Sequence, residues 1–173
     1  MIGVTDCTTI RSVMASNPDP VLVSIGADGA EGADFFDGDY DNGIIAHEYA
    51  HGISNRLVGG PAQAGCLGNG EQMGEGWSDF FALVTSVKPG RDGSERAGIG
   101  TYVCREEPNG NGIRSNPYST DLSIDPETYE DLPSNTQVHA LGAVWNSMLW
   151  DVYWALVEEH GFSTDLILSL IHI

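Results

Sequence analysis

The chain has 173 residues and a mass of 18.5 kDa, enough for one domain or one lobe of a larger domain. Seven Lys and Arg residues stand against 25 Asp and Glu residues, so the formal net charge is −18. This charge repels phosphate backbones and anionic lipid, and it argues against nucleic-acid and membrane-surface binding. Hydrophobic residues make up 41% of the chain, which suffices for a core, and no apolar run approaches the roughly 18 residues that span a bilayer. We therefore expect a soluble protein.

The first 36 residues form an unassigned lead-in, in which residues 21–25 alternate as in a strand. Asp41 or Asn42 is expected to cap a helix over about 43–57, which the sequence Gly59-Gly60-Pro61 ends. A second helix is expected over about 74–87, before Lys88-Pro89-Gly90.

Residues 89–136 are rich in Gly, Pro, Asn and Asp, which predicts long loops with at most short helical turns. Apolar residues at three- and four-residue spacing then predict a third helix over about 137–160, closed by Gly161. The predicted fold of this chain is therefore mainly α.

The last six residues, 168–173, read LSLIHI. This hexapeptide matches the translation of a transposase-type sequencing adaptor, so we exclude it from the fold and do not count His172 as a ligand. The expected boundaries are thus 1–36 for a remnant of an N-terminal lobe, 37–167 for a partial catalytic domain and 168–173 for the adaptor. Three cysteines, Cys7, Cys66 and Cys104, allow at most one disulfide, and both a 66–104 bridge and free thiols remain open.

An H-E-x-x-H motif, His47-Glu48-Tyr49-Ala50-His51, lies inside the first expected helix. Residues four apart share a helical face, so both imidazoles can bind one metal ion while Glu48 addresses a water on that ion. The alternative is two histidines without a ligand role on an amphipathic helix.

Two carboxylates at the start of the second expected helix complete a candidate zinc site. Glu75 lies 28 residues after His47, and Asp79 follows one helical turn later on the same face. One of them can bind the metal while the other accepts the outer N–H of a ligand histidine. The alternative is a favourable charge near a helix N-terminus together with a solvated face.

The stretch DYDNGIIAHEYAHGISNRLVGGP (39–61), followed by MGEGWSDFFAL (73–83), resembles the fungalysin family of secreted zinc metallopeptidases. The blocks GIRSNPYSTDL (112–122) and VHALGAVWNSML (138–149) resemble it too, so the similarity covers about residues 37–161 in order. The resemblance implies a thermolysin-like catalytic core, α+β in the full family domain, of which this chain is an incomplete part.

The resemblance also implies roles for individual residues. His47, His51 and Glu75 would bind one catalytic zinc ion, Glu48 would be the catalytic base, and Asp79 would orient the first histidine ligand.

His139 would stabilise the transition state; the alternative is a capping or partly buried histidine. Arg114 is a further candidate that would hold a substrate carbonyl, with an ion pair as its alternative. Tyr118 is interpreted as structural.

The implied activity is that of a secreted, monomeric endopeptidase acting on proteins or peptides. Secretion comes from the resemblance, because no basic-then-apolar leader opens this chain. Calcium bound by the acidic loops is an additional, unlocated expectation.

A different class of protein is suggested by the sequence Asp37-Gly38-Asp39-Tyr40-Asp41, which resembles the first half of an EF-hand loop. Position twelve of that loop would be Glu48, so a non-catalytic calcium-binding module is the alternative function. Against it, position six is Asn42 where the loop requires Gly, and an entering helix is missing.

Overall fold

The computed structural model describes residues 36–68, 73–134 and 137–163. The chain divides into two compact units, Met1–Asp34 and Phe35–Ile173, and the first lies outside the described residues, as do the strand expected over 21–25 and the segment 168–173. The described elements are mostly helical, which confirms the expected fold class. In chain order they are η1 (Gly38–Tyr40), α2 (Asn42–Gly59), α3 (Met73–Ser86), η2 (Tyr129–Ser134) and α4 (Val138–His160).

The start of α2 is fixed by the Asp41 side chain. One oxygen of this carboxylate accepts hydrogen bonds from the backbone N–H groups of Gly43 and Ile44, at 2.8 and 3.2 Å. The other oxygen accepts one from the Val103 N–H at 3.1 Å, which ties the helix to a distant loop. Asp41, and not Asn42, is therefore the N-cap.

The end of α2 lies two residues beyond the predicted one. Gly60 caps the helix with φ of +69°, and its N–H donates to the carbonyl of Arg56 at 3.0 Å. Cys66 packs closely against Gly59, the last helical residue: a Cβ at Gly59 would lie 2.6 Å from the Cys66 sulfur. A local sequence pattern does not contain this contact.

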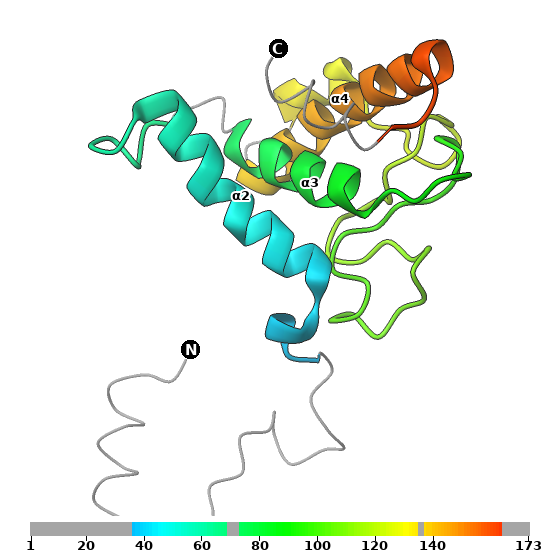
Figure 1. The fold of residues 1–173 in the computed structure, drawn as a ribbon, viewed down its shortest axis with the longest axis horizontal. Coiled ribbons are helices and arrows are strands. Elements are labelled where there is room, and N and C mark those ends of the chain that lie inside the picture. The colour runs from blue at the N-terminus through cyan, green and yellow to red at the C-terminus, as the bar shows by residue number, and fades with distance from the viewer. Residues whose placement is uncertain (1–35, 69–72, 135–136, 164–173) are drawn as a thin grey trace, which may run out of the picture. The chain divides into compact units, whose positions relative to one another are not determined.

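Helix α3 packs against both α2 and α4 and lies between them in Figure 1. The crossing of α3 and α4 is close because two glycines face each other there. A Cβ at Gly76 would lie 2.4 Å from the carbonyl oxygen of Gly142, and a Cβ at Gly142 would lie 2.6 Å from the Cβ of Glu75. This crossing brings Glu75 next to the first turn of α4.

The core lies between α3, α4 and the connection that joins them. The stacked rings of Trp150 and Tyr153 have centroids 5.5 Å apart. The connection is fastened by two isolated bridges, Ala97 with Tyr118 and Ile99 with Gly112, within long loops as predicted. The buried core residues are Ala82, Leu83, Val84, Ile99, Tyr118, Ala143, Trp150, Tyr153 and Trp154.

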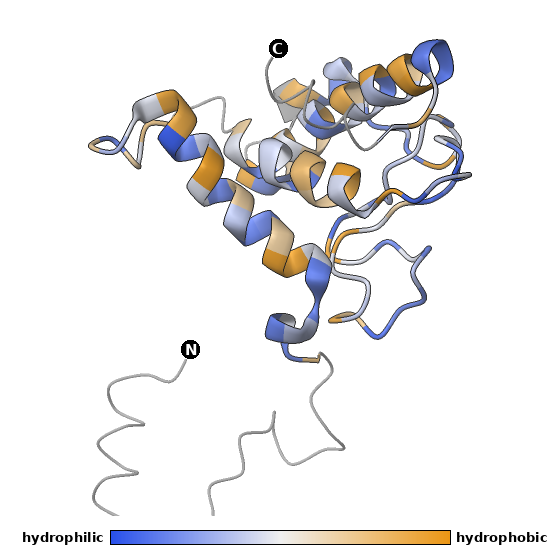
Figure 2. Ribbon diagram, viewed as in Figure 1, coloured by the Kyte–Doolittle hydropathy of each residue, from blue (hydrophilic) through white to orange (hydrophobic). Residues whose placement is uncertain are grey.

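Helix α2 is the least covered of the three α-helices. Its buried residues are His47 and Ala50, whereas Tyr49 and Leu57 are exposed, and Figure 2 shows hydrophobic residues scattered along the whole helix. None of the helices in the described part of the chain has the length and apolarity needed to cross a membrane. Cys66 and Cys104 are both free thiols.

Candidate metal centre

Three side chains from two helices converge on one point. His47 and His51 lie one turn apart on α2, and Glu75 lies in the first turn of α3. The Nε2 atom of His47 is 3.1 Å from the Nε2 of His51 and 3.1 Å from Oε2 of Glu75. The Nε2 of His51 is 3.5 Å from the same carboxylate oxygen.

These separations fit a single metal ion. Two ligands of a tetrahedral ion with bonds of about 2.0–2.1 Å lie about 3.3 Å apart, and the three measured distances bracket this value. Two imidazole nitrogens and one carboxylate oxygen are a donor set that suits zinc. Within the described ranges, no other group of three His, Cys, Asp or Glu side chains is arranged in this way.

Asp79 lies behind His47. Its Oδ1 accepts a hydrogen bond from Nδ1 of His47 at 2.7 Å, and the carboxylate is 1% exposed. With the proton on Nδ1, the Nε2 lone pair of His47 faces the other two ligand atoms, as metal binding requires.

Asp79 is held in turn by two residues of the connection between α3 and α4. Arg114 donates from Nε to Oδ2 at 2.6 Å and from Nη2 to Oδ1 at 2.8 Å. The Tyr118 hydroxyl, which is fully buried, donates to Oδ2. The aspartate thus accepts four hydrogen bonds and is almost completely buried.

The acid–base properties of the cluster follow from these contacts. Burial raises the pKa of Asp79, but the hydrogen bonds from His47 and Arg114 outweigh it and hold that pKa below its ordinary value. Burial lowers the pKa of His47, yet the hydrogen bonds to Asp79 and Glu75 outweigh it and raise that pKa to about 9. Hydrogen bonds with His47 and then His51 lower the pKa of Glu75. Without a metal, a proton on His47 therefore serves as the counter-charge of two carboxylates.

His139 approaches the cluster from α4. Its Nε2 lies 3.5 Å from Oε2 of Glu75, and its side chain is 46% exposed. Glu48 is exposed on α2 and is not one of the three converging residues. The structure thus brings His139 to the ligand carboxylate and leaves Glu48 open to solvent.

Arg114 pairs with Asp79 in the structure. Its side chain is 6% exposed and forms an ion pair with Asp79 through two hydrogen bonds, which is the alternative considered for it. Tyr118 is buried as a structural residue should be, but its hydroxyl also contacts Asp79. Neither pairing is evident in the sequence, because the partners lie 35 and 39 positions apart without a periodic pattern.

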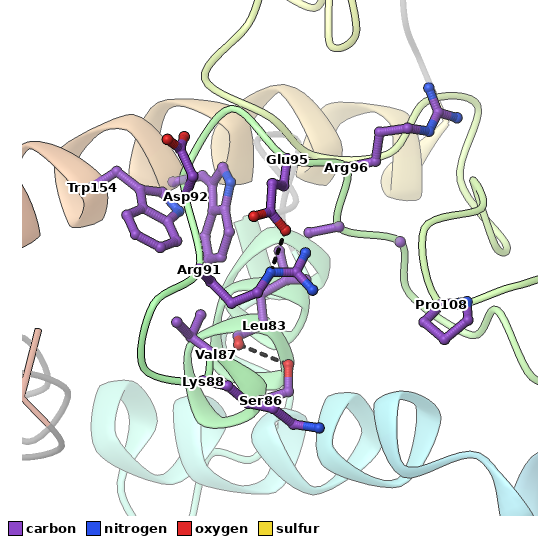
Figure 3. Close-up of a pocket in the computed structure, with 13 residues that line it drawn as sticks. Leu83, Ser86, Val87, Lys88, Arg91, Asp92, Glu95, Arg96, Pro108 and Trp154 are labelled. Carbon is purple, nitrogen blue, oxygen red and sulfur yellow. Dashed lines mark hydrogen bonds and ion pairs between the residues drawn. The ribbon is translucent and has the colours of Figure 1, made fainter.

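Two hollows lie at the surface. One of about 370 Å³ adjoins the cluster, since Arg114, Gln137 and His139 line it. The other, of about 260 Å³, is shown in Figure 3 and lies between the end of α3, residues 88–98 and Trp154 of α4. In that view Arg91 points toward Glu95, with which it forms an ion pair. None of the three converging residues lines either hollow; the first one reaches the cluster only through Arg114 and His139.

The EF-hand interpretation is not favoured. A calcium loop needs an irregular backbone through its sixth position and beyond, whereas α2 begins at Asn42, which is that position. The carboxylates of Asp37 and Asp41 accept backbone hydrogen bonds as helix caps. Glu48 lies in the middle of a helix.

The described helices therefore bring together the two histidines of the H-E-x-x-H motif and a glutamate, a group that could hold a metal ion. Residues 31–170 match the family model for fungalysin metallopeptidase (M36). The chain belongs to this family.

Curated proteins similar to this chain are named as extracellular metalloproteinases. The extracellular metalloproteinase mep of Aspergillus fumigatus (strain Af293) is 47% identical over 133 residues, which is 76% of this chain and 20% of that protein. Extracellular metalloproteinase 2 of Trichophyton tonsurans is 44% identical over 132 residues, 75% of this chain and 20% of the relative. The extracellular metalloproteinase of Pyrenophora tritici-repentis is 43% identical over 133 residues, with 76% and 20% covered. The chain spans about a fifth of the length of these relatives.

Proposed function

We propose that this chain is the metal-binding part of the catalytic domain of a zinc-dependent endopeptidase that cleaves proteins or peptides. The observation that carries the proposal is the convergence of His47, His51 and Glu75 at separations of 3.1–3.5 Å. Asp79 supports it, because its hydrogen bond to Nδ1 leaves Nε2 of His47 free for a metal.

Zinc bound there would polarise a peptide carbonyl and make a water molecule acidic enough to attack it near neutral pH. We propose that Glu48 takes the proton from this water and later gives it to the leaving amine. Its exposure on α2 next to His47 leaves it accessible to both. His139 would donate a hydrogen bond to the carbonyl oxygen as negative charge develops there.

The hollow of about 370 Å³ is the place we propose for a substrate side chain. It opens beside His139, and its walls combine Ile113, Ala140 and Ala143 with the polar groups of Arg114 and Glu127. In this proposal Arg114 acts mainly on Asp79 and reaches substrate only at the rim of the hollow.

We also propose that the parent protein is secreted and acts as a monomer. The names of its relatives as extracellular enzymes support the first part. The acidic composition is compatible with an extracellular medium.

Glu48→Gln tests the chemistry separately from the metal site. We expect this variant to keep zinc, because Glu48 is not a ligand, and to lose about 10²–10⁴-fold in peptide cleavage, the usual contribution of a positioned acid–base group. Glu158→Gln, a change at an exposed residue of α4, is the matched control and should cleave at the wild-type rate. Wild-type cleavage by Glu48→Gln would remove Glu48 from the mechanism.

A further inference from the structure

The side chain of Gln137 connects the start of α4 to His139. Its Oε1 accepts hydrogen bonds from the backbone N–H groups of His139 and Ala140, at 2.8 and 3.0 Å, and so caps the helix. Its Nε2 lies 2.6 Å from Nδ1 of His139. One amide group therefore contacts both the helix backbone and the imidazole ring.

The cap fixes which amide atom faces the ring. Backbone N–H groups only donate, so the atom that contacts them must be the amide oxygen. The amide nitrogen then faces Nδ1, and an NH₂ group only donates. Nδ1 of His139 must accept this hydrogen bond, and the single proton of the neutral ring belongs on Nε2.

His47 has the opposite arrangement. A carboxylate, Asp79, accepts from its Nδ1–H, which leaves the Nε2 lone pair of His47 pointing at the metal cluster. Gln137 donates to Nδ1 of His139, which leaves an Nε2–H pointing toward Glu75, 3.5 Å away. Asp79 thus leaves His47 ready to bind a metal ion, whereas Gln137 makes His139 a hydrogen-bond donor.

We propose that Gln137 is a positioning residue that fixes the tautomer of His139, so that an Nε2–H faces the metal centre. The consequence for catalysis rests on the proposed peptidase function; the tautomer itself does not. A ring held in this form presents its donor to a developing negative oxygen without first moving a proton.

The tautomer can be measured by long-range ¹H–¹⁵N correlation NMR on the labelled full chain, loaded with zinc, at a pH where the ring is neutral. We expect an acceptor-type shift for Nδ1 and a protonated-type shift for Nε2, with the signals assigned by loss in His139→Gln. A protonated Nδ1 in the wild type would overturn the proposal.

Two variants separate the ring contact from the helix cap. Gln137→Glu keeps an oxygen for the cap but turns an acceptor toward the ring, so the proton should move to Nδ1. Gln137→Ser keeps a good N-cap without reaching the ring and should give a mixture of tautomers. Identical ring spectra in the wild type and both variants would contradict the role of Gln137.

Turnover measured at the same pH tests the catalytic consequence. We expect Gln137→Glu to lower kcat about 10²-fold with little change in KM, because the lost hydrogen bond from Nε2–H of His139 acts on the transition state and not on the bound substrate. A Gln137→Glu chain that has the proton on Nδ1 of His139 and still turns over at the wild-type kcat would overturn that consequence. If no form of the chain cleaves peptides, the peptidase proposal fails, while the spectra still decide the tautomer.

Discussion

Asp79 supports the candidate metal centre although it is not one of the three converging residues. It accepts four hydrogen bonds from His47, Arg114 and Tyr118 and is 1% exposed. Because Arg114 and Tyr118 hold Asp79 and Asp79 holds His47, the orientation of the His47 ring depends on residues that lie 35 and 39 positions beyond Asp79 in the chain.

Removing the Tyr118 hydroxyl should destabilise the chain. Tyr118→Phe deletes a buried hydrogen bond to a charged acceptor, and we expect a loss of about 1.5–3 kcal/mol in the free energy of unfolding, measured with urea. Tyr153→Phe is the matched control, because Tyr153 is equally buried and its hydroxyl has no hydrogen-bond partner in the described structure. That change should cost nothing or stabilise slightly. Equal losses of unfolding free energy in both variants would show that the hydrogen bond from Tyr118 to Asp79 does not contribute to stability.

Two buried aspartates should give opposite responses to pH. The folded-state pKa of Asp79 is below its ordinary value because hydrogen bonds from His47 and Arg114 outweigh burial. The ionised Asp79 therefore stabilises the folded state above the ordinary pKa of about 3.9, and this stabilisation is lost as the pH falls through the lower folded-state pKa. Burial raises the pKa of Asp125 despite its hydrogen bond from Ser147. That group favours the folded state at low pH, and the benefit disappears as the pH rises through its raised pKa.

Asn substitutions at Asp79 and Asp125 measure the difference between their pH responses in the zinc-free chain. Asp79→Asn should lose about 3 kcal/mol at pH 7, since it leaves the buried Arg114 charge unpaired, and should lose progressively less below pH 4. Asp125→Asn should be more stable than wild type at pH 7 and should lose that advantage in acid. Urea unfolding at pH 3, 4 and 7 compares them; parallel pH profiles for the two variants would contradict the assignment.

At the scale of single residues, the sequence predicted the pairs whose members lie close together in the chain. The i, i+4 histidines and the Glu75–Asp79 pair are visible because one helical turn separates their members. The partners Arg114, Tyr118 and Gln137 were not assigned to these contacts. The first two depend on the folding of a loop, and Gln137 acts through a side chain that sequence patterns describe only as the start of a helix.

At the scale of elements, the helices were predictable because their ends are set locally. Asp41 and Gly161 are sequence-local caps, and α3 and α4 begin and end within a residue of the expected positions. The end of α2 differs from the prediction by two residues, because Gly60 rather than an earlier residue caps the helix. The relative placement of α3 and α4 was equally hidden, since it depends on two glycines, Gly76 and Gly142, meeting at the crossing.

Gly142→Ala tests that crossing. The new Cβ would lie 2.6 Å from the backbone nitrogen of Gly76, which cannot move aside easily, so we expect a loss of about 1–3 kcal/mol from overpacking and weaker zinc binding by the displaced Glu75.

Gly52→Ala is the matched control for Gly142→Ala. This exposed glycine within α2 has nothing within 4 Å of a new Cβ, so alanine should stabilise the helix by up to about 1 kcal/mol. Thermal unfolding of both variants, with zinc titration, measures the effects. A Gly142→Ala chain as stable as Gly52→Ala would show that the crossing tolerates a side chain.

At the scale of the whole molecule, the candidate metal centre draws on three helices of the described chain. The three converging residues, Asp79 and His139 come from α2, α3 and α4. Helix α2 packs on α3, and α3 packs on α4, within a fifth of the length of the relatives. Helix α2 nevertheless exposes Tyr49 and Leu57. The sequence predicted loops over residues 89–136 but not the bridges within them, because bridges between distant residues leave no local pattern.

The central claim is that His47, His51 and Glu75 form one metal site. The most direct test is the zinc content of the purified chain after dialysis, with circular dichroism to confirm helix. We predict about one tightly held zinc ion per wild-type chain, none in Glu75→Ala, and one in the exposed control Glu158→Ala. A helical wild-type chain without zinc, or a Glu75→Ala chain that holds zinc as tightly as wild type, would contradict the account.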